Sequence, residues 1–486
     1  MPLLLLHLSL LQWVLIAIGI AYLAGVISAI VIILYDYSSP PKALAWIMVI
    51  VYLPIIGLVL YGTFGRGVRK KRLFRKKGIL EFGLTHHETP GMLDTHPILS
   101  EQPLENQSII ALLLNNNHAP ITTSNKVQLY YNSGTTFNGI LDAIAEAKEH
   151  IHLEYYIFQD GIIGKKFRDA LIKKAQEGVE IRIIYDAVGS WSLSKSFIKS
   201  LKKHGIQVSE FYPVRFPLFG NRVNYRNHRK IVVIDHYIGF VGGVNISDTY
   251  VGTDPEVGDW RDTHVKIVGE ATQQLQGIFI QDWNFAAKES LQIAPSKSRY
   301  EHGDHCLIQI ASSGPDSEYA SIMQAYFTAI NSAKRYVYIS MPYFVPNEAI
   351  STALKTAALR GVKVCLLIPK KSDSTILNHG LRSYLEEFIE AGLEIFLYKK
   401  GFNHGKLMMV DGRFCSVGTA NLDIRSFDQN FEVNALIYDH ATCQKLEKRF
   451  ENDIKEAEKV LLTNFKESKK RNRLFEKIAR LFSPLL

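Results

Sequence analysis

Hydrophobic residues are concentrated at the start of the chain. Residues 10–35 and residues 43–65 form two apolar stretches without a charged residue. Each is long enough for a helix that crosses a bilayer, which takes about 20 apolar residues, and Pro54 in the second stretch does not forbid a span. A cleaved signal peptide would have a basic start and a shorter apolar core, and no Lys or Arg precedes Asp36. Rather than a buried core hairpin, the pattern therefore predicts two transmembrane helices joined by a short polar turn.

The pattern changes after residue 120. Residues 138–186 alternate between segments with helical spacing and short, strongly apolar strands. Gly178 follows the second helical segment, where a helix C-cap favours glycine. Residues 324–373 repeat this plan, with Gly361 in the matching place. The repetition predicts a duplicated α/β unit, and the apolar strands predict a sandwich with mostly parallel central strands.

The length of 486 residues exceeds that of one compact domain. We therefore expect several units, with both α/β lobes following the membrane segment. The terminal segment has apolar residues at helical spacing with basic residues between them, which fits either a packed helix or one on the membrane surface. The expected segments are two transmembrane helices (1–65), a basic juxtamembrane segment and linker (66–120), a first lobe (121–295), a second lobe (296–463) and a basic amphipathic tail (464–486).

Positive charge is placed at the membrane end and at the tail. Residues 66–77 hold eight Lys or Arg and no acid, and residues 464–486 hold seven basic and two acidic residues. The summed charge of these two segments is larger than the formal net charge of the whole chain, which is +9. The rest of the chain is therefore mildly acidic. The positive-inside rule then places residues 66–77, and all that follows, in the cytoplasm. The distribution fits an anionic membrane surface better than a nucleic-acid groove.

Cysteine usage points to no metal or disulfide framework. The four cysteines are far apart and form no CxxC pair. A zinc site is therefore not expected, and reduced thiols are the default for a cytoplasmic domain.

One polar motif occurs twice with identical spacing. The first copy, NHRKIVVID, contains His228, Lys230 and Asp235. The second copy, NHGKLMMVD, differs in sequence but not in the spacing of its polar residues. A single HxKxxxxD is a weak signal, whereas two copies at the same place in a repeated unit are a strong one. The matching residues of the second copy are His404, Lys406 and Asp411, and each copy ends in Gly-x-x-Asn, at Asn245 and Asn421.

The doubled motif suits chemistry on a phosphodiester. An anionic phosphoryl group needs fixed positive charge and oriented donors around its transition state. Lys230 and Lys406 can supply the charge, and Asn245 and Asn421 can donate to phosphate oxygens. One histidine can attack phosphorus while the other protonates the leaving alkoxide. Because neither half holds both groups, we expect the halves to face each other across a pseudo-twofold interface and form one active site.

A nucleophilic imidazole also needs a carboxylate on its other nitrogen to fix its tautomer. Asp262 in WRDTHVKIVG aligns with Glu432 in FEVNALIYD, and each lies about thirty residues past the histidine of its own half. We expect these two acids to orient the histidines, the alternative being solvated surface carboxylates. Asp235 and Asp411 follow apolar strands, and we expect them to fix backbone or lysine geometry.

With these strings in place, the chain resembles the phospholipase D superfamily, and more closely the bacterial cardiolipin synthases. LEYYIF, YDAVGS, SSGPD, SVGTANLDIRSF and NFEVNA contribute to the resemblance, as does the AW…P…G…YG…FG pattern of the N-terminal segment. The resemblance implies two phospholipase D-like α/β/α sandwich lobes. The chain departs from the family pattern at three positions: Gly405, where Ala or Ser is usual, His236, where Gly is typical, and Thr249, where Glu is frequent.

The resemblance also implies an activity. The enzyme would be a phosphatidyltransferase that joins two phosphatidylglycerol molecules into cardiolipin and glycerol through a phosphohistidine, with His228 as nucleophile and His404 as general acid. It implies no cofactor and no metal, and a place in the bacterial cytoplasmic membrane. Phosphatidylglycerol and anionic lipids are the expected partners, without nucleic acid. A phospholipase D-type hydrolase or headgroup exchanger is the alternative, and a nuclease-like phosphodiesterase is less favoured; the acceptor and the oligomeric state stay open.

Overall fold

The computed structural model describes residues 9–36, 40–53, 55–64, 102–214, 224–251, 259–292, 305–371 and 375–463. The chain forms two compact units, the first made of residues 1–76 with 214–223 and the second of residues 77–213 with 224–486. The predicted basic segment 66–77 and the predicted tail 464–486 lie outside the described residues.

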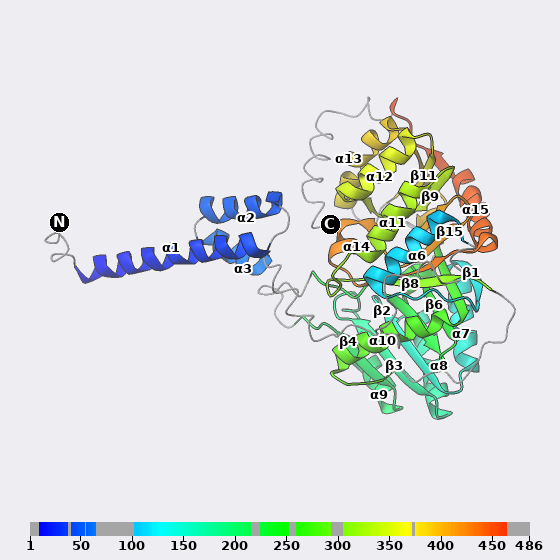
Figure 1. Ribbon diagram of the computed structural model, residues 1–486. Coiled ribbons are helices and arrows are strands. Elements are labelled where there is room, and N and C mark those ends of the chain that lie inside the picture. The colour runs from blue at the N-terminus through cyan, green and yellow to red at the C-terminus, as the bar shows by residue number, and fades with distance from the viewer. Residues whose placement is uncertain are drawn as a thin grey trace. The chain divides into compact units, whose positions relative to one another are not determined.

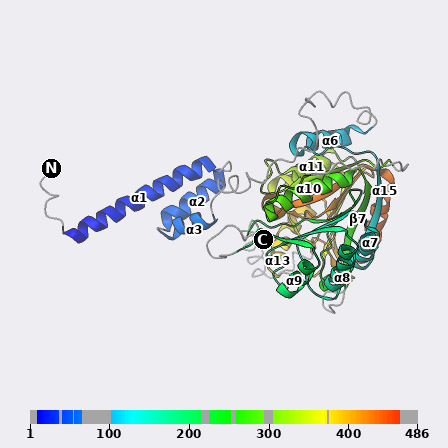
Figure 2. The same ribbon diagram turned by 90° about the horizontal axis from the view of Figure 1, so that it is seen from below.

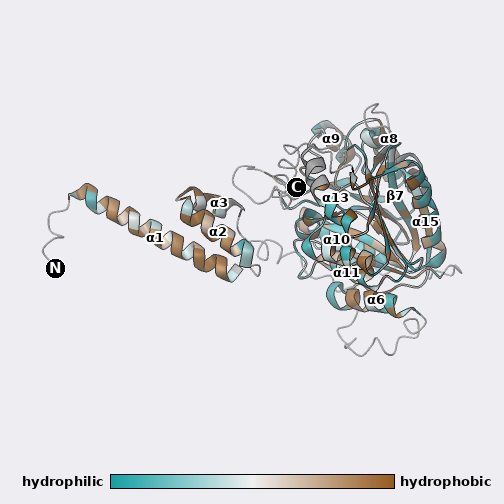
Figure 3. Ribbon diagram, turned by 90° about the horizontal axis from the view of Figure 1, so that it is seen from above, coloured by the Kyte–Doolittle hydropathy of each residue, from teal (hydrophilic) through white to brown (hydrophobic). Residues whose placement is uncertain are grey.

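The first unit contains the apolar helices. Helix α1 (Leu10–Asp36) is strongly hydrophobic along its length (Figure 3). Its residues Leu10–Tyr35 have a mean hydropathy of 2.7 and, among the described residues, form the one helix long and apolar enough to cross a membrane. The second apolar stretch differs from the single helix that we predicted. It forms α2 (Pro40–Tyr52) and α3 (Ile56–Phe64), because proline at position 54 removes a backbone donor and disfavours helix at the residue before it.

The second unit contains two sheets with the same strand order. The first sheet runs in the order β1-β7-β6-β5-β2-β3-β4 and the second in the order β8-β17-β15-β14-β9-β11-β12, with β18 added at its edge. Each matching pair of neighbours also has the same orientation. The predicted duplication is therefore present strand by strand. The strands are β1 (Asn125–Asn132), β2 (His150–Tyr155), β3 (Glu180–Asp186), β4 (Gln207–Phe211), β5 (Lys230–Ile234), β6 (Ile238–Gly242), β7 (Asp259–Gly269), β8 (Ile308–Ser313), β9 (Tyr336–Ser340), β11 (Lys363–Pro369), β12 (Glu394–Tyr398), β14 (Leu407–Val410), β15 (Phe414–Gly418), β17 (Glu432–Ile437) and β18 (Ala457–Lys459).

The prediction of mostly parallel central strands is wrong. Within the repeated strand order, only β2-β3-β4 and β9-β11-β12 pair in parallel, and the strands in the middle of each sheet are antiparallel. Each motif strand is followed by a three-residue turn, Asp235–Tyr237 and Asp411–Arg413, whose first two residues have positive φ. Such a short connection can join only antiparallel neighbours. Each lobe is therefore a mixed α/β sandwich.

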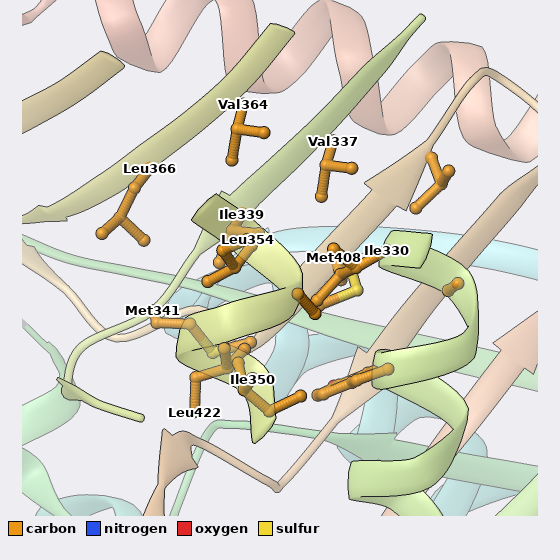
Figure 4. Close-up of a cluster of buried hydrophobic side chains, with 14 of the residues drawn as sticks. Ile330, Val337, Ile339, Met341, Ile350, Leu354, Val364, Leu366, Met408 and Leu422 are labelled. Carbon is orange, nitrogen blue, oxygen red and sulfur yellow. The ribbon is translucent and has the colours of Figure 1, made fainter. Parts of the chain in front are cut away.

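In each lobe, helices pack on the face of the sheet that points away from the other lobe, and further helices lie beside the face that points toward it (Figure 1). Their apolar residues recur at helical spacing and enter three buried clusters, one in each lobe and one between the two sheets. Figure 4 shows the second-lobe cluster, in which Ile330, Val337 and Leu354 converge from a helix, a strand and a second helix. The helices are α7 (Ser133–Glu146), α8 (Ile162–Gln176), α9 (Lys195–Lys203) and α10 (Ala271–Ala287) in the first lobe, and α11 (Ser321–Ser332), α12 (Glu348–Leu359), α13 (Thr375–Glu390) and α15 (His440–Lys455) in the second.

The segment expected as a linker contains a helix that packs on the second lobe. Helix α6 (Leu104–Asn117) buries Ile109, Ile110 and Leu113 in the second-lobe cluster, beside α11 (Figure 2). The Asn117 side chain accepts from the Ser312 amide at 2.9 Å and donates to the Ser312 carbonyl at 2.8 Å. The chain therefore completes part of the second lobe before it enters the first.

Candidate active site

Each motif histidine is attached through its backbone to the other lobe. The His228 amide donates to the Phe431 carbonyl at 3.0 Å, next to β17. The His404 amide donates to the Arg261 carbonyl at 2.7 Å, on β7. The short strand β13 (Gly401–Asn403), just before His404, pairs in parallel with the start of β7. These reciprocal contacts, of the kind that twofold-related halves make, bring both motif segments to the junction of the lobes.

The two orienting acids lie on the histidines, and the pairing is crossed. His228 Nδ1 lies 3.0 Å from both carboxylate oxygens of Glu432, which belongs to the second lobe. His404 Nδ1 lies 2.7 Å from Oδ2 of Asp262, which belongs to the first lobe. Both carboxylates are fully buried. Each imidazole is therefore held by the lobe that does not carry it, with Nδ1 as the hydrogen-bond donor.

Two buried lysines place positive charge beside the histidines. Lys230 Nζ donates to the His228 carbonyl at 2.7 Å, and Lys406 Nζ donates to the His404 carbonyl at 2.8 Å. Lys406 Nζ also lies 3.1 Å from each ring nitrogen of His404. Neither lysine is exposed. The two-residue spacing from the histidine thus brings each ammonium group back to the backbone of its own histidine.

The site favours neutral imidazoles. Burial lowers the pKa of His228 to about 4, although Glu432 opposes this shift. Burial and the two motif lysines hold the pKa of His404 well below its usual value. Burial and the neighbouring Lys406 also lower the pKa of Lys230 to about 7. Several cationic groups therefore compete within one desolvated space, and an anionic phosphate would relieve their mutual repulsion.

The two acids differ in their ionisation. Burial raises the pKa of Asp262 to about 6, although Lys406 opposes the shift. Burial also acts against ionisation of Glu432, but His228, Lys230 and the Thr419 hydroxyl together bring its pKa below the usual value. Thr419 Oγ1 donates to Glu432 at 2.5 Å. Glu432 is thus the more firmly ionised acid and the better partner for an imidazole that gains positive charge.

Aromatic rings that the sequence reasoning did not single out form walls around the histidines. Tyr156 meets His228 edge-on, with ring centroids 5.0 Å apart. Tyr250 and Trp260 contact His404 at centroid distances of 5.4 and 5.1 Å. Tyr156 is the fourth residue of LEYYIF and Trp260 opens WRDTHVKIVG, so both lie in strings that we noted without assigning these side chains.

The two predicted phosphate-binding asparagines have different surroundings. Asn245 Oδ1 accepts from the Ile157 amide at 3.1 Å, and its Nδ2 donates to the Tyr250 hydroxyl at 2.5 Å. Asn421 is also buried, but its Oδ1 has no hydrogen-bond partner. Asn245 is therefore engaged in holding the wall beside His404, whereas the Asn421 side chain keeps hydrogen-bonding capacity.

Asp235 and Asp411 are not brought together with the histidines. Each follows its motif strand and lies at the far end of that strand from the lysine. Asp235 accepts from the amides of Lys148, Glu149 and His150 at 2.8–3.0 Å. Asp411 accepts in the same way from three amides that lead into β9, at 2.8–2.9 Å. In both lobes the motif aspartate joins a turn to the start of the neighbouring strand.

Comparison with known proteins gives a consistent result. A family model described as "Cardiolipin synthase, PLD-like domain" matches residues 140–283 and 326–454, one segment in each lobe. A second, described as "Phospholipase_D-nuclease N-terminal", matches residues 24–66. Both matches follow the division between the apolar N-terminal part and the duplicated α/β part.

Curated relatives cover nearly the whole chain. A cardiolipin synthase of Oceanobacillus iheyensis is 39% identical over 473 residues, which cover 96% of this chain and 98% of the relative. A cardiolipin synthase of a Geobacillus strain is 41% identical over 480 residues, covering 97% and 93%. Among solved structures, phosphatidylserine synthase of Haemophilus influenzae has a TM-score of 0.60 at 15% identity, and covers 78% of this chain and all of that one. That likeness concerns the fold.

Proposed function

Because this chain belongs to the cardiolipin synthase family of phospholipase D-like enzymes, we propose that it transfers a phosphatidyl group between two phosphatidylglycerol molecules. The products are cardiolipin and glycerol. The observation that supports this reaction best is the pair of neutral imidazoles, each on a buried carboxylate of the other lobe, with a buried lysine beside each one.

In the first half-reaction, His228 Nε2 attacks the phosphorus of one phosphatidylglycerol. The N–P bond forms as the bond from phosphorus to the glycerol headgroup oxygen breaks, and His404 gives that oxygen a proton. Glycerol leaves and a phosphatidyl-histidine remains. Lys230 and Lys406 stabilise the negative charge on the phosphoryl oxygens, and Asn421 is placed to donate to one of them.

In the second half-reaction, His404 takes the proton from a headgroup hydroxyl of the second phosphatidylglycerol. That oxygen attacks phosphorus, the N–P bond breaks, and His228 returns to its neutral form as cardiolipin departs. Over the two half-reactions one phosphate ester bond is exchanged for another, so the transfer needs no nucleotide or other energy source.

The asymmetry of the two acids supports His228 as nucleophile. Its ring becomes a cationic phosphoimidazolium, and the firmly ionised Glu432 compensates that charge. The His228 side chain is also the more exposed, at 12% against 7% for His404. His404 must be protonated in order to act as the acid, and the charge of a bound phosphodiester raises its pKa toward that form.

We further propose a two-pass anchor with the catalytic unit in the cytoplasm. Helix α1 is one crossing. The second crossing would be formed by α2 and α3, which contain 13 and 9 residues. In the structure these helices pack against each other, with the Trp46 and Tyr61 rings 5.5 Å apart, so the crossing requires them to open into one span. The basic segment 66–77 that follows supports the cytoplasmic side. We keep the lobe boundaries at 121–295 and 296–463, with α6 of the 66–120 segment serving the second lobe.

The test uses the purified full-length protein with vesicles of phosphatidylglycerol and no nucleotide, and mass spectrometry of the lipids and of released glycerol. We expect cardiolipin and glycerol in equal amounts, and neither from His228→Ala. Phosphatidic acid as the main lipid product would instead identify a hydrolase, with water as acceptor, and would overturn the proposal.

A further inference from the structure

A second group of chemically reactive side chains lies at the end of β5 opposite to the active site. Glu149 and His150 stand at the start of β2, and His236 lies in the turn after β5. One ligand atom from each lies within 4.8 Å of the other two, and among the described residues this is the one such group of three. His236 Nε2 lies 3.7 Å from Oε2 of Glu149.

The imidazole nitrogens of this group are available as ligands. His150 is 5% exposed, and its Nε2 is buried without a hydrogen-bond partner. His236 Nδ1 donates to Gln276 Oε1 at 2.9 Å, which leaves the lone pair on Nε2 facing the carboxylate of Glu149. A ring nitrogen that donates to a side-chain oxygen while the other nitrogen stays bare is the usual arrangement of a metal-binding histidine.

The second lobe provides an internal comparison. Ile151 pairs with Ile234 in the first lobe, and Val337 pairs with Val410 in the second. By this register the counterparts of Glu149, His150 and His236 are Arg335, Tyr336 and Gly412, which form no ligand set.

The backbone conformation of the turn at His236 disfavours a histidine, which suggests that this side chain has a role. His236 has φ +65, and Gly412 occupies the same place with φ +70. Glycine adopts this left-handed conformation without strain, whereas histidine does so at a cost. A strained side chain is thus kept in the first lobe, beside a buried, unpartnered imidazole nitrogen.

We propose that Glu149, His150 and His236 bind a divalent first-row transition ion of the Zn²⁺ class, with water as the fourth ligand. Two imidazole nitrogens and one carboxylate oxygen are a common donor set for this ion. Two ligands of a tetrahedral zinc ion lie about 3.4 Å apart, so the 3.7 Å between His236 and Glu149 needs little adjustment. The Glu149 side chain is 71% exposed and free to rotate, and it opens the site to solvent.

The ion would act on stability rather than on phosphoryl transfer. It would join the start of β2 to the β5–β6 turn, the same two segments that Asp235 already connects through three backbone amides. Because the ion would bind the folded form, it would stabilise that form by an amount that grows with the logarithm of the ion concentration above its Kd. The catalytic histidines lie beyond the other end of β5, so the expected independence of the reaction from metal is unchanged.

The test is calorimetric titration of ZnCl₂ into the full-length protein in detergent micelles, together with thermal unfolding. We expect a site that is lost in the double variant His150→Tyr, His236→Gly, which copies the second lobe. Glu149→Gln, an exposed change that leaves the fold intact, should weaken that site at least tenfold. His204→Gln, at the C-cap of α9, and His228→Ala should retain it, and zinc should raise the unfolding temperature of the wild type and of both controls.

Two outcomes would overturn the proposal. Zinc stoichiometry and affinity in the double variant and in Glu149→Gln equal to those of the wild type would place the ion elsewhere. Loss of the site in His228→Ala would place it in the active site instead.

Discussion

The Nδ1 of His404 lies 2.7 Å from Oδ2 of Asp262, a residue of the opposite lobe 142 positions earlier in the chain. His228 and Glu432 repeat this relationship in the other direction. Neither lobe by itself therefore holds an oriented imidazole. A protein with one such lobe could build the same site only by pairing two copies, and the duplicated chain fixes that pairing covalently.

The crossed pairs predict which variants share a defect. Asp262→Asn and Glu432→Gln should each lower turnover of phosphatidylglycerol by roughly 10²–10⁴-fold, because an amide cannot compensate the charge of its histidine. His228→Ala and His404→Ala should abolish turnover. A phosphatidyl ester of p-nitrophenol distinguishes the pairs, because its leaving group needs no proton.

With that ester, His404→Ala and Asp262→Asn should still release one p-nitrophenolate per active site in a rapid first turnover. His228→Ala should give no burst, and Glu432→Gln a slowed one. Stopped-flow absorbance measures the burst. If Asp262→Asn lost the burst and Glu432→Gln kept it, the nucleophile would be His404.

The pKa values of the free enzyme predict a narrow pH optimum for kcat/KM. As pH falls, Asp262 gains a proton near 6 and ceases to hold His404 as a carboxylate, and His228 is protonated near 4 and loses its nucleophilic lone pair. As pH rises, His404, whose pKa is held well below its usual value, loses the proton that it must donate, and Lys230 loses its charge as the pH passes about 7. The value of kcat/KM should therefore fall on both sides of its maximum, and the alkaline fall should begin below pH 7.

The profile of kcat, which reports the bound state, should extend further to the alkaline side, because the phosphate anion raises the pKa of Lys230. Mixed micelles with a fixed fraction of phosphatidylglycerol allow both profiles to be measured. Alkaline limbs that coincide would show that Lys230 does not face the phosphate.

Asp411 should matter for folding more than for chemistry. Asp411→Ala leaves three backbone amides without their acceptor, which costs about 2–4 kcal/mol. We expect a fall of several degrees in Tm by calorimetry, with kcat at low temperature within about threefold of wild type. Asp142→Ala, an exposed aspartate on α7, is the control. A loss of kcat as large as that of Asp262→Asn, without a change in Tm, would give Asp411 a catalytic role.

The duplication and the set of polar residues could be predicted from the sequence because both appear as motifs repeated with the same spacing. It did not predict the crossed pairing, since Glu432 lies close in sequence to His404 and far from His228, and only the packing of the lobes exchanges these neighbours. The helix α6 escaped notice because its apolar residues, such as Ile110 and Leu113, complete a face with a lobe that follows much later in the chain.

The mixed sheet shows a similar limit. Apolar strands between helices are typical of parallel sheets, and our prediction of the sheet followed that pattern. The short turn after each motif strand permits only antiparallel pairing and was given too little weight. His236 in that turn departed from the glycine of the family pattern, and its positive φ confirms that the position favours glycine. The histidine group around it could not be recognised, because its members are separated by 86 residues of chain.

Gly405, between His404 and Lys406, should tolerate alanine. A Cβ there would meet nothing closer than the Ser340 hydroxyl at 3.5 Å, an ordinary contact. Gly405→Ala should therefore raise the free energy of unfolding by about 0.4–1 kcal/mol, by restricting the unfolded chain, and leave turnover near wild type. Gly418→Ala is the contrast, because its Cβ would collide with the Asn434 side chain. Equal Tm shifts in the two variants would contradict this reading.

The proposed two-pass topology can be tested with single cysteines, because all four native cysteines are buried. If both apolar segments cross, Ser39→Cys, in the turn between them, should react with a membrane-impermeant maleimide in intact spheroplasts. Ser9→Cys and Glu318→Cys should react only after lysis, since two crossings with the basic segment 66–77 inside would leave both the N-terminus and the chain after residue 77 in the cytoplasm. A single crossing by α1, with α2 and α3 folded back on the inner side, would protect Ser39→Cys and expose Ser9→Cys. Labelling of Glu318→Cys in intact spheroplasts would place the catalytic unit outside.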